Sequence, residues 1–181
     1  GAHGGGILLA GKGGTGKSTT ALACLDSSLL YAGDDYVLLS AGDRPKIYSI
    51  YNSAKLAADG ARRLPHLASA LGDQQARGNE KAILFLHDRL PHKLAQSFDL
   101  RAILLPRVTG QPQTRLQPAS PTEALLALAP SSLFQLPGAG PDALQILAQV
   151  TRQVPSYMLQ LGTDIAMIPS SIEGLPADLC E

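Results

Sequence analysis

The residues with the clearest chemistry form a glycine-rich segment near the start of the chain. Residues 11–18 read G-K-G-G-T-G-K-S, which matches the pattern G-x-x-x-x-G-K-[ST] of phosphate-binding loops. Glycines let such a loop curl until successive backbone N–H groups point at phosphate oxygens. In this pattern Lys17 reaches the β- and γ-phosphates of a nucleoside triphosphate, and the hydroxyl of Ser18 ligates Mg²⁺. The sequence therefore predicts binding of a nucleoside triphosphate with Mg²⁺ by Gly11, Gly13, Gly14, Thr15, Gly16, Lys17, Ser18 and Thr19.

The segments on either side of the loop are those that a phosphate site requires. The apolar run 7–10 predicts a buried strand, and 18–31 carries helix-forming residues that end before Gly33. The N-terminus of that helix would face the same phosphates. This context favours a phosphate site over an ordinary glycine-rich turn.

The rest of the chain predicts an α/β fold with a mixed sheet flanked by helices. Strands 36–40 and 46–51 are separated by the turn 41–45, and a turn this short requires an antiparallel hairpin. We expect further strands at 81–87, 100–106 and 156–161, helices at 53–64, 121–128 and 141–150, and loops at 72–79 and 111–121. We expect one P-loop kinase domain over residues 1–181.

Composition narrows the classes of partner. Apolar residues make up 45% of the chain and charged residues 17%, which is typical of a folded domain and not of a disordered one. The 15 basic side chains balance the 15 acidic ones, so we expect neither nucleic acid nor a membrane surface as a partner. No apolar run reaches membrane-spanning length, and the two cysteines have no metal-ligand spacing. We therefore expect a cytoplasmic protein.

A magnesium site needs a carboxylate in addition to Ser18. Two positions compete. Asp34 and Asp35 lie between the first helix and the hairpin, where they could also be turn residues. Asp88 follows the apolar strand 81–87, where it could also be a helix cap. Spacing alone does not choose between them.

The loop followed by Gly33-Asp34-Asp35-Tyr36-Val37-Leu38 resembles the catalytic domain of the HPr kinase/phosphorylase family. It is most similar to the HPr-kinase-related bacterial serine kinases, some of which modify lasso-peptide precursors. The stretches 51–56, 102–107 and 126–136 extend the resemblance over most of the chain. It implies a phosphoenolpyruvate-carboxykinase-like α/β fold, transfer of the γ-phosphate of ATP to a serine of a peptide or protein, and a homo-oligomer.

The resemblance also implies roles for the acidic pair and favours it over Asp88. Asp34 would act as general base on the acceptor hydroxyl, and Asp35 would hold Mg²⁺ together with Ser18. Together with Lys17 these two carboxylates would form the catalytic set. A carboxylate base beside Mg-ATP suits this chemistry, since it accepts the hydroxyl proton as the oxygen attacks.

The sequence departs from the family in two ways. Thr19 follows the loop serine where the bifunctional members carry glutamate, and their later signature stretch is absent, so kinase activity is favoured over phosphorylase activity. The family also has a histidine well before the loop, whereas His3 is too close to it. We expect that element in an N-terminal part of the gene product that precedes Gly1.

Two basic residues are candidates for binding substrate. Arg107 follows an expected strand and could clamp a phosphate or an acceptor carboxylate, because a guanidinium makes planar bidentate contacts. Lys55 could act in a similar way, and either residue could instead be ordinary surface. Two other functions fit the same motif, a nucleotide-binding switch or ATPase without kinase activity and a small-molecule kinase.

Overall fold

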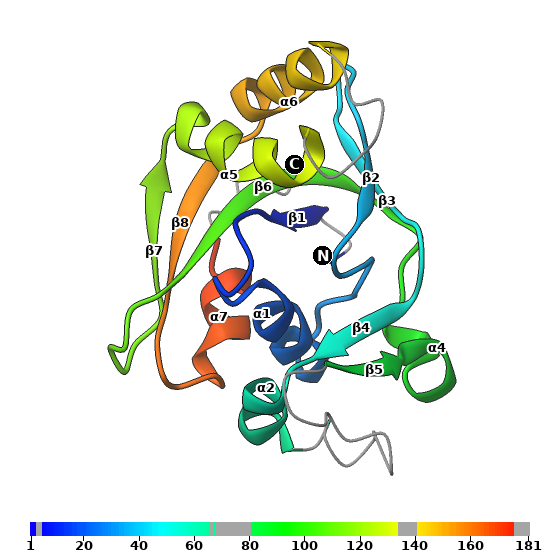
Figure 1. Cartoon of the computed structure of the whole chain (residues 1–181), viewed down its shortest axis with the longest axis vertical. Coiled ribbons are helices and arrows are strands. Elements are labelled where there is room, and N and C mark those ends of the chain that lie inside the picture. Colours follow the sequence, from blue (N-terminus) through cyan, green and yellow to red (C-terminus); the bar gives the residue numbers. More distant parts are fainter. Residues whose placement is uncertain (3–4, 66, 68–80, 134–140, 176–181) are drawn as a thin grey trace.

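A long central strand, β6 (Ser97–Val108), organises the fold, because three other strands pair with it. In this computed structural model, which describes residues 1–2, 5–65, 67, 81–133 and 141–175, β1 (Gly6–Leu9) and β8 (Ser156–Leu161) pair with β6 in parallel (Figure 1). The strand β3 (Lys46–Ser49) pairs with it in antiparallel orientation. The strands β2 (Val37–Ser40) and β7 (Arg115–Ala119) complete the sheet, β2 antiparallel to β3 and β7 antiparallel to β8. The resulting order is β2-β3-β6-β8-β7. The sheet is mixed, as predicted.

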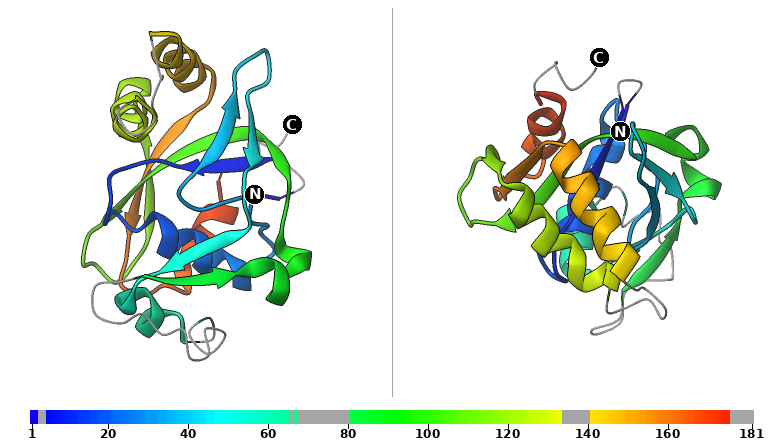
Figure 2. Two further views of the ribbon diagram at one scale, coloured as in Figure 1. Left: turned by 45° about the vertical axis from the view of Figure 1, so that its right-hand side comes forward. Right: turned by 90° about the horizontal axis from the view of Figure 1, so that it is seen from above.

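Helices lie on both sides of β6 (Figure 2). On one side α1 (Lys17–Ala23) and α7 (Met167–Glu173) contribute to a core with Leu22, Leu104 and Leu159. On the other side α5 (Pro121–Leu133) and α6 (Pro141–Gln153) pack through a second core that contains Ile103. The strand β6 contributes apolar side chains to both cores, because its alternate residues point to opposite faces of the sheet.

A second, two-stranded sheet lies apart from the main one. It consists of β4 (Ser53–Leu56) and β5 (Ala82–Phe85), which are antiparallel. Short helices flank it: α2 (Ala58–Arg63), α4 (Leu86–Arg89) and the 3₁₀ turn η2 (Pro91–Lys93). Among the described residues, no helix has the length and apolar character needed to cross a membrane.

The predicted hairpin is confirmed, since β2 and β3 pair with Val37 opposite Ser49 and Ser40 opposite Lys46. The strand at 156–161 has the expected bounds. Helices begin at Pro121 and Pro141 as expected, and the first runs five residues further than predicted, to Leu133. Ser120 and Glu123 form a reciprocal cap at the start of α5, with Ser120 N–H and Oγ donating to Glu123 Oε2 at 2.8 and 2.7 Å. The expected loop 72–79 lies outside the described residues.

Three predicted elements were wrong in part. The first helix does not run to residue 31, because α1 ends at Ala23 and the 3₁₀ turn η1 (Cys24–Asp26) follows. Ser27 then takes an extended conformation, and its hydroxyl donates to the carbonyl of Cys24 at 2.8 Å. A serine that bonds to the nearby backbone competes with helical hydrogen bonds, which explains the early end.

The other two errors concern strands. Residues 53–56 form β4 and not the start of a helix, since Ala54 and Leu56 are buried while Lys55 between them is exposed, an alternation of period two. Residues 115–119 form β7 and not part of a loop. Pro118 is tolerated there because β7 is at the edge of the sheet, where a missing N–H breaks no ladder.

Candidate active site

The glycine-rich loop joins the end of β1 to the start of α1 and has the backbone that its glycines permit. Gly14 and Gly16 have φ values of +84° and +101°, in the region that L-residues rarely adopt. A Cβ at Gly13 or Gly14 would meet no atom within 4 Å, so this side of the loop is open. A Cβ at Gly16 would lie 2.5 Å from Leu161 Cδ1, so there the loop packs closely on β8.

Lys17 points back over the loop. Its Nζ donates to the carbonyl oxygens of Gly11 and Lys12, each at 2.8 Å. Burial lowers the pKa of Lys17, and the charges of Asp35 and Asp34 oppose that shift. The ammonium group therefore lies in the field of both carboxylates, although the two residues come from a distant loop.

Asp34 is held from two sides. Its Oδ1 accepts a 2.7 Å hydrogen bond from the hydroxyl of Ser18 on α1. Its Oδ2 accepts a 2.8 Å bond from the backbone N–H of Lys55 on β4. A cation bound by Ser18 would consequently meet Asp34 first.

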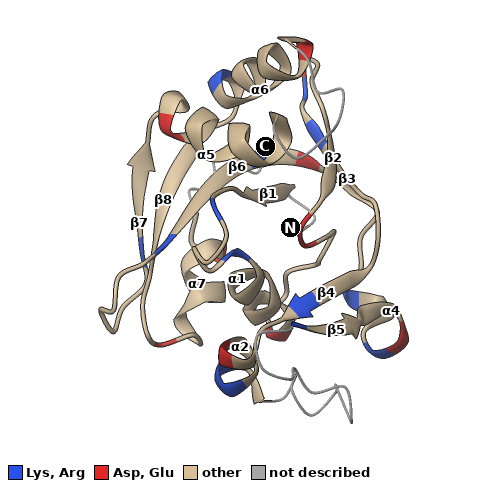
Figure 3. Cartoon of the chain, viewed as in Figure 1, with Lys and Arg blue, Asp and Glu red and all other residues tan. Residues whose placement is uncertain are grey.

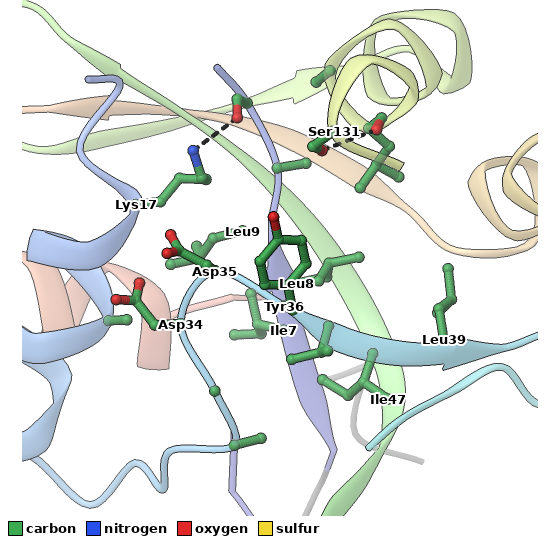
Figure 4. A pocket seen from close by; sticks show the side chains of 18 of the residues that line it. Ile7, Leu8, Leu9, Lys17, Asp34, Asp35, Tyr36, Leu39, Ile47 and Ser131 are labelled. Atoms are coloured by element: carbon green, nitrogen blue, oxygen red, sulfur yellow. Dashed lines mark hydrogen bonds between the residues drawn. The ribbon is translucent and has the colours of Figure 1, made fainter. Parts of the chain in front are cut away.

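Asp35 pairs with the side chain of the same lysine. The Nζ of Lys55 lies 2.7 Å from Asp35 Oδ2, and this bond raises the pKa of Lys55. Both side chains are partly exposed, at 47% for Lys55 and 33% for Asp35. Figure 4 shows Asp34 and Asp35 next to Lys17, at the same end of one cavity. One residue, Lys55, thus contacts both members of the acidic pair.

Two tyrosines that the sequence analysis missed surround the acidic pair. Tyr31 is buried, and its hydroxyl donates to the carbonyl of Ser53 at 3.4 Å. Burial raises the pKa of Tyr31, and the charge of Asp34 adds to the effect. Tyr51 follows β3; partial burial and then the charge of Asp35 raise its pKa. Tyr31 belongs to no motif, and the resemblance of the stretch 51–56 gives Tyr51 no role, so only the fold reveals their place near the acidic pair.

The loop and the carboxylates open into one cavity of about 790 Å³. Of the predicted residues, Gly11, Gly13, Lys17, Asp34 and Asp35 line it. The others of the set lie on the loop or beside it: Gly14, Thr15, Gly16, Ser18, Thr19 and Lys55. The structure therefore brings the loop, the acidic pair and Lys55 together.

Arg107 and Asp88 lie elsewhere. Arg107 lines a separate hollow of about 530 Å³ with Arg115 and Gln160, at the end of β6 and the edge formed by β7 and β8. The hollow also includes Val108, which a Cβ at Gly16 would approach to 3.8 Å. Asp88 is on α4, 72% exposed, and among the described residues it does not line the cavity of the loop. The expected strand that would have presented it ends at Phe85.

The donor set suits Mg²⁺ bound together with a phosphate. Ser18 and the two aspartates offer hard oxygen ligands, and Mg²⁺ takes few protein carboxylates and fills its sphere with water and phosphate oxygens. Within the described part of the chain, no three His, Cys, Asp or Glu side chains form a cluster that would hold a metal alone. The hydroxyl of Thr20, which lines the cavity, is buried and has no hydrogen-bond partner. The residues therefore fit a metal that arrives with a nucleotide.

Comparison with solved structures shows a similarity at the level of the fold. The chain is similar to the HPr(Ser) kinase/phosphatase from Coxiella burnetii, with a TM-score of 0.50 and 10% sequence identity over 93% of this chain and 85% of that one. The chain has an HPr-kinase-like fold. No protein-family model and no curated protein sequence matches it. The expected fold class is confirmed.

Proposed function

We propose that this protein is an ATP-dependent kinase that transfers the γ-phosphate to a serine hydroxyl of a peptide or protein, with Mg²⁺. One observation carries the proposal. The 2.7 Å bond from Ser18 to Asp34 joins the phosphate loop to an acidic pair that lines the same cavity as Lys17. A loop alone would serve a nucleotide switch equally well, whereas a second carboxylate facing the cavity supplies a base for an acceptor hydroxyl.

In this proposal the loop residues bind the phosphates. Backbone N–H groups of the loop contact phosphate oxygens, and Lys17 leaves the carbonyls of Gly11 and Lys12 for the β- and γ-phosphates. Ser18 and Thr19 supply hydroxyls in the first turn of α1. Bound Mg²⁺ would neutralise charge that develops on the phosphate oxygens. The residues that we propose to contact the bound nucleotide and its Mg²⁺ are Gly11, Gly13, Gly14, Thr15, Gly16, Lys17, Ser18 and Thr19.

The hydrogen bonds of the acidic pair suggest roles opposite to those that the family resemblance implies. Both oxygens of Asp34 accept bonds, from Ser18 and from the backbone of Lys55, so Asp34 is fixed beside the metal-ligating hydroxyl. Asp35 lines the cavity, and in the described part of the chain its carboxylate is held by the side chain of Lys55. We therefore assign Asp34 to the metal with Ser18, and Asp35 to the base.

The transfer step then follows from these positions. Asp35 accepts the proton of the serine hydroxyl while the serine oxygen attacks the γ-phosphorus. A new O–P bond forms, the bond from the γ-phosphorus to the β,γ-bridging oxygen breaks, and ADP leaves. The ammonium group of Lys17 stabilises the negative charge that develops on the leaving oxygen. Lys55 holds Asp35 in place and can contact the acceptor, and Arg107 is a contact only for an acceptor that also reaches the end of β6.

The proposal includes neither nucleic acid nor a membrane as a partner. We propose the cytoplasm as the location of the protein, because Mg-ATP is abundant there. We also propose that the protein forms a homo-oligomer, on the basis of its HPr-kinase-like fold. A small-molecule hydroxyl remains the second acceptor class to test.

The fate of the γ-phosphate tests the proposal. The protein is incubated with γ-labelled ATP, Mg²⁺ and serine-containing peptides, alongside Asp35→Asn and Asp34→Asn variants. The expected result is label on peptide from wild type, its loss in Asp35→Asn, and less label from Asp34→Asn when Mg²⁺ is limiting. Label that appears only as free phosphate, at the same rate in all three proteins, would overturn the kinase proposal in favour of an ATPase or switch.

A further inference from the structure

The cavity of the phosphate loop has two chemically different ends. Among the described residues, the charged side chains that line it (Lys12, Lys17, Asp34 and Asp35) belong to the loop and the acidic pair. Beyond Tyr36 the described lining is neutral and mostly apolar. We call this second part the apolar arm and define it by Tyr36, Leu39, Ile47, Leu128, Ile146 and Leu147.

The apolar arm is bounded by rigid elements. Its floor is the β2–β3 hairpin and the edge of the main sheet, and its roof is the pair α5 and α6. Leu128, Leu147 and Ile47 are also members of the second core, so the walls of the arm are fixed by packing. The charged residues of α6, Asp142 and Arg152, lie at its two ends and leave the middle of the helix neutral (Figure 3).

The arm opens from the γ-phosphate end of the site. Lys17 and the Ser18–Asp34 pair face the β- and γ-phosphates in the proposed function, and Asp35 is next to them. Tyr36 follows Asp35 directly in the chain, and Figure 4 shows its ring beyond Asp35, with Leu39 and Ile47 further from Lys17. From the loop, Gly11 and Gly13 border the cavity, while the described lining does not include Gly14, Thr15 or Gly16. Whatever fills the arm therefore approaches the γ-phosphate from the side of Asp35.

We infer that the apolar arm is the acceptor subsite, and that it takes an apolar side chain next to the serine of an extended polypeptide. This rests on the proposed kinase function and adds the acceptor's chemistry to it. A neutral pocket that leads to a carboxylate base selects an apolar neighbour, because burying a charged one there would leave it without a partner. A nucleoside in the arm is the rival occupant, and the experiment separates the two.

Ile146 offers a test that leaves the catalytic groups intact. It lines the arm from α6 and is 40% exposed, so a carboxylate there is compatible with folding. Leu144 is 43% exposed on the same helix and does not line the described cavity, so it serves as the matched control. Ile146→Asp and Leu144→Asp are compared with wild type on nine-residue peptides with a central serine. Each peptide carries Leu, Phe, Lys or Asp at one flanking position.

We expect wild type and Leu144→Asp to prefer Leu or Phe over Asp at one flanking position by about tenfold or more in kcat/KM. Ile146→Asp should lose that preference and gain on the Lys peptides, with the KM for ATP within about twofold of wild type. Labelled peptides without an apolar preference, or a preference that survives Ile146→Asp, would overturn the inference and leave the kinase proposal standing. A rise in the KM for ATP caused by Ile146→Asp alone would assign the arm to the nucleoside. No labelled peptide at all, from a protein that binds Mg-ATP, would overturn the inference and the serine-kinase proposal together.

Discussion

The hydroxyl of Ser18 lies 2.7 Å from a carboxylate oxygen of Asp34, which is 16 residues further along the chain. This bond places the last residue of the phosphate loop against the first residue of the acidic pair. Asp35 is directed instead to the side chain of Lys55, at 2.7 Å. Neighbouring carboxylates therefore have different partners, and single substitutions should have different effects.

Asparagine at each position should separate a metal role from a base role. Asp34→Asn should raise the Mg²⁺ concentration needed for half-maximal activity by about tenfold, since it removes a charged ligand. Asp35→Asn should lower kcat by about 10²–10⁴-fold and leave the Mg²⁺ requirement unchanged, as expected for a general base. Mg²⁺ titrations of peptide phosphorylation measure both. If Asp34→Asn lowered kcat at saturating Mg²⁺ while Asp35→Asn shifted the Mg²⁺ requirement, the two assignments would be reversed.

Lys55→Ala should separate activity from stability. The ion pair with Asp35 is partly exposed, so its loss should change the free energy of unfolding by about 0–1 kcal/mol. Activity should fall by about tenfold or more, because Asp35 loses the contact that orients it. Lys55→Arg is the control, and it should recover part of the activity by restoring a cation. Urea unfolding and label transfer are compared on the same preparations, and an activity loss that merely followed a loss of folded protein would contradict this assignment.

Two loop glycines should fail for different reasons when changed to alanine. Gly13 has no positive φ, and its Cβ would meet no atom within 4 Å, so Gly13→Ala should change stability by less than about 0.5 kcal/mol. Its methyl group would face the open side of the loop and weaken ATP binding. Gly16→Ala should destabilise by about 1–3 kcal/mol, because its φ is +101° and its Cβ would lie 2.5 Å from Leu161 Cδ1. Urea unfolding and ATP titration distinguish them, and equal stability losses would contradict the prediction.

The alkaline limit of stability should depend on Tyr31. Burial raises the pKa of this phenol above its ordinary value of 10.0, so the folded protein retains a proton that the unfolded chain releases. The part of the free energy of unfolding that depends on this proton is fully present below pH 10. It is lost as pH rises, by up to about 1.4 kcal/mol per pH unit. Tyr31→Phe should remove this part of the decline. Unfolding free energies of both proteins between pH 9 and 11.5 measure it; parallel curves would show that Tyr31 titrates normally.

The features that could be predicted from sequence are those with a local signal. The phosphate loop is a contiguous motif, and the hairpin follows from two apolar runs around a turn too short for any other connection. The acidic pair was located by resemblance, and the structure places it in the cavity that Lys17 also lines. The strand expected before Asp88 does not carry it to the phosphate loop. The strand β5 ends three residues before Asp88 and belongs to a sheet that does not contain β1.

Other features depend on distant parts of the chain. Residues 53–56 read as a helix because only pairing with β5 reveals the alternation of buried Ala54 and exposed Lys55. The strand β7 was missed because a proline argues against a strand unless the strand is known to lie at an edge. Arg107 was placed near the site by sequence, yet alternation along β6 and pairing with Gln160 put it in a separate hollow.

Lys55 supports one carboxylate with its backbone and the other with its side chain, and these contacts would evolve differently. The N–H that bonds Asp34 belongs to every residue except proline, so almost any replacement at position 55 preserves it. The bond to Asp35 needs a long cation. Among homologues, variation at this position would therefore record how strictly Asp35 must be held, and would reveal nothing of the support for Asp34.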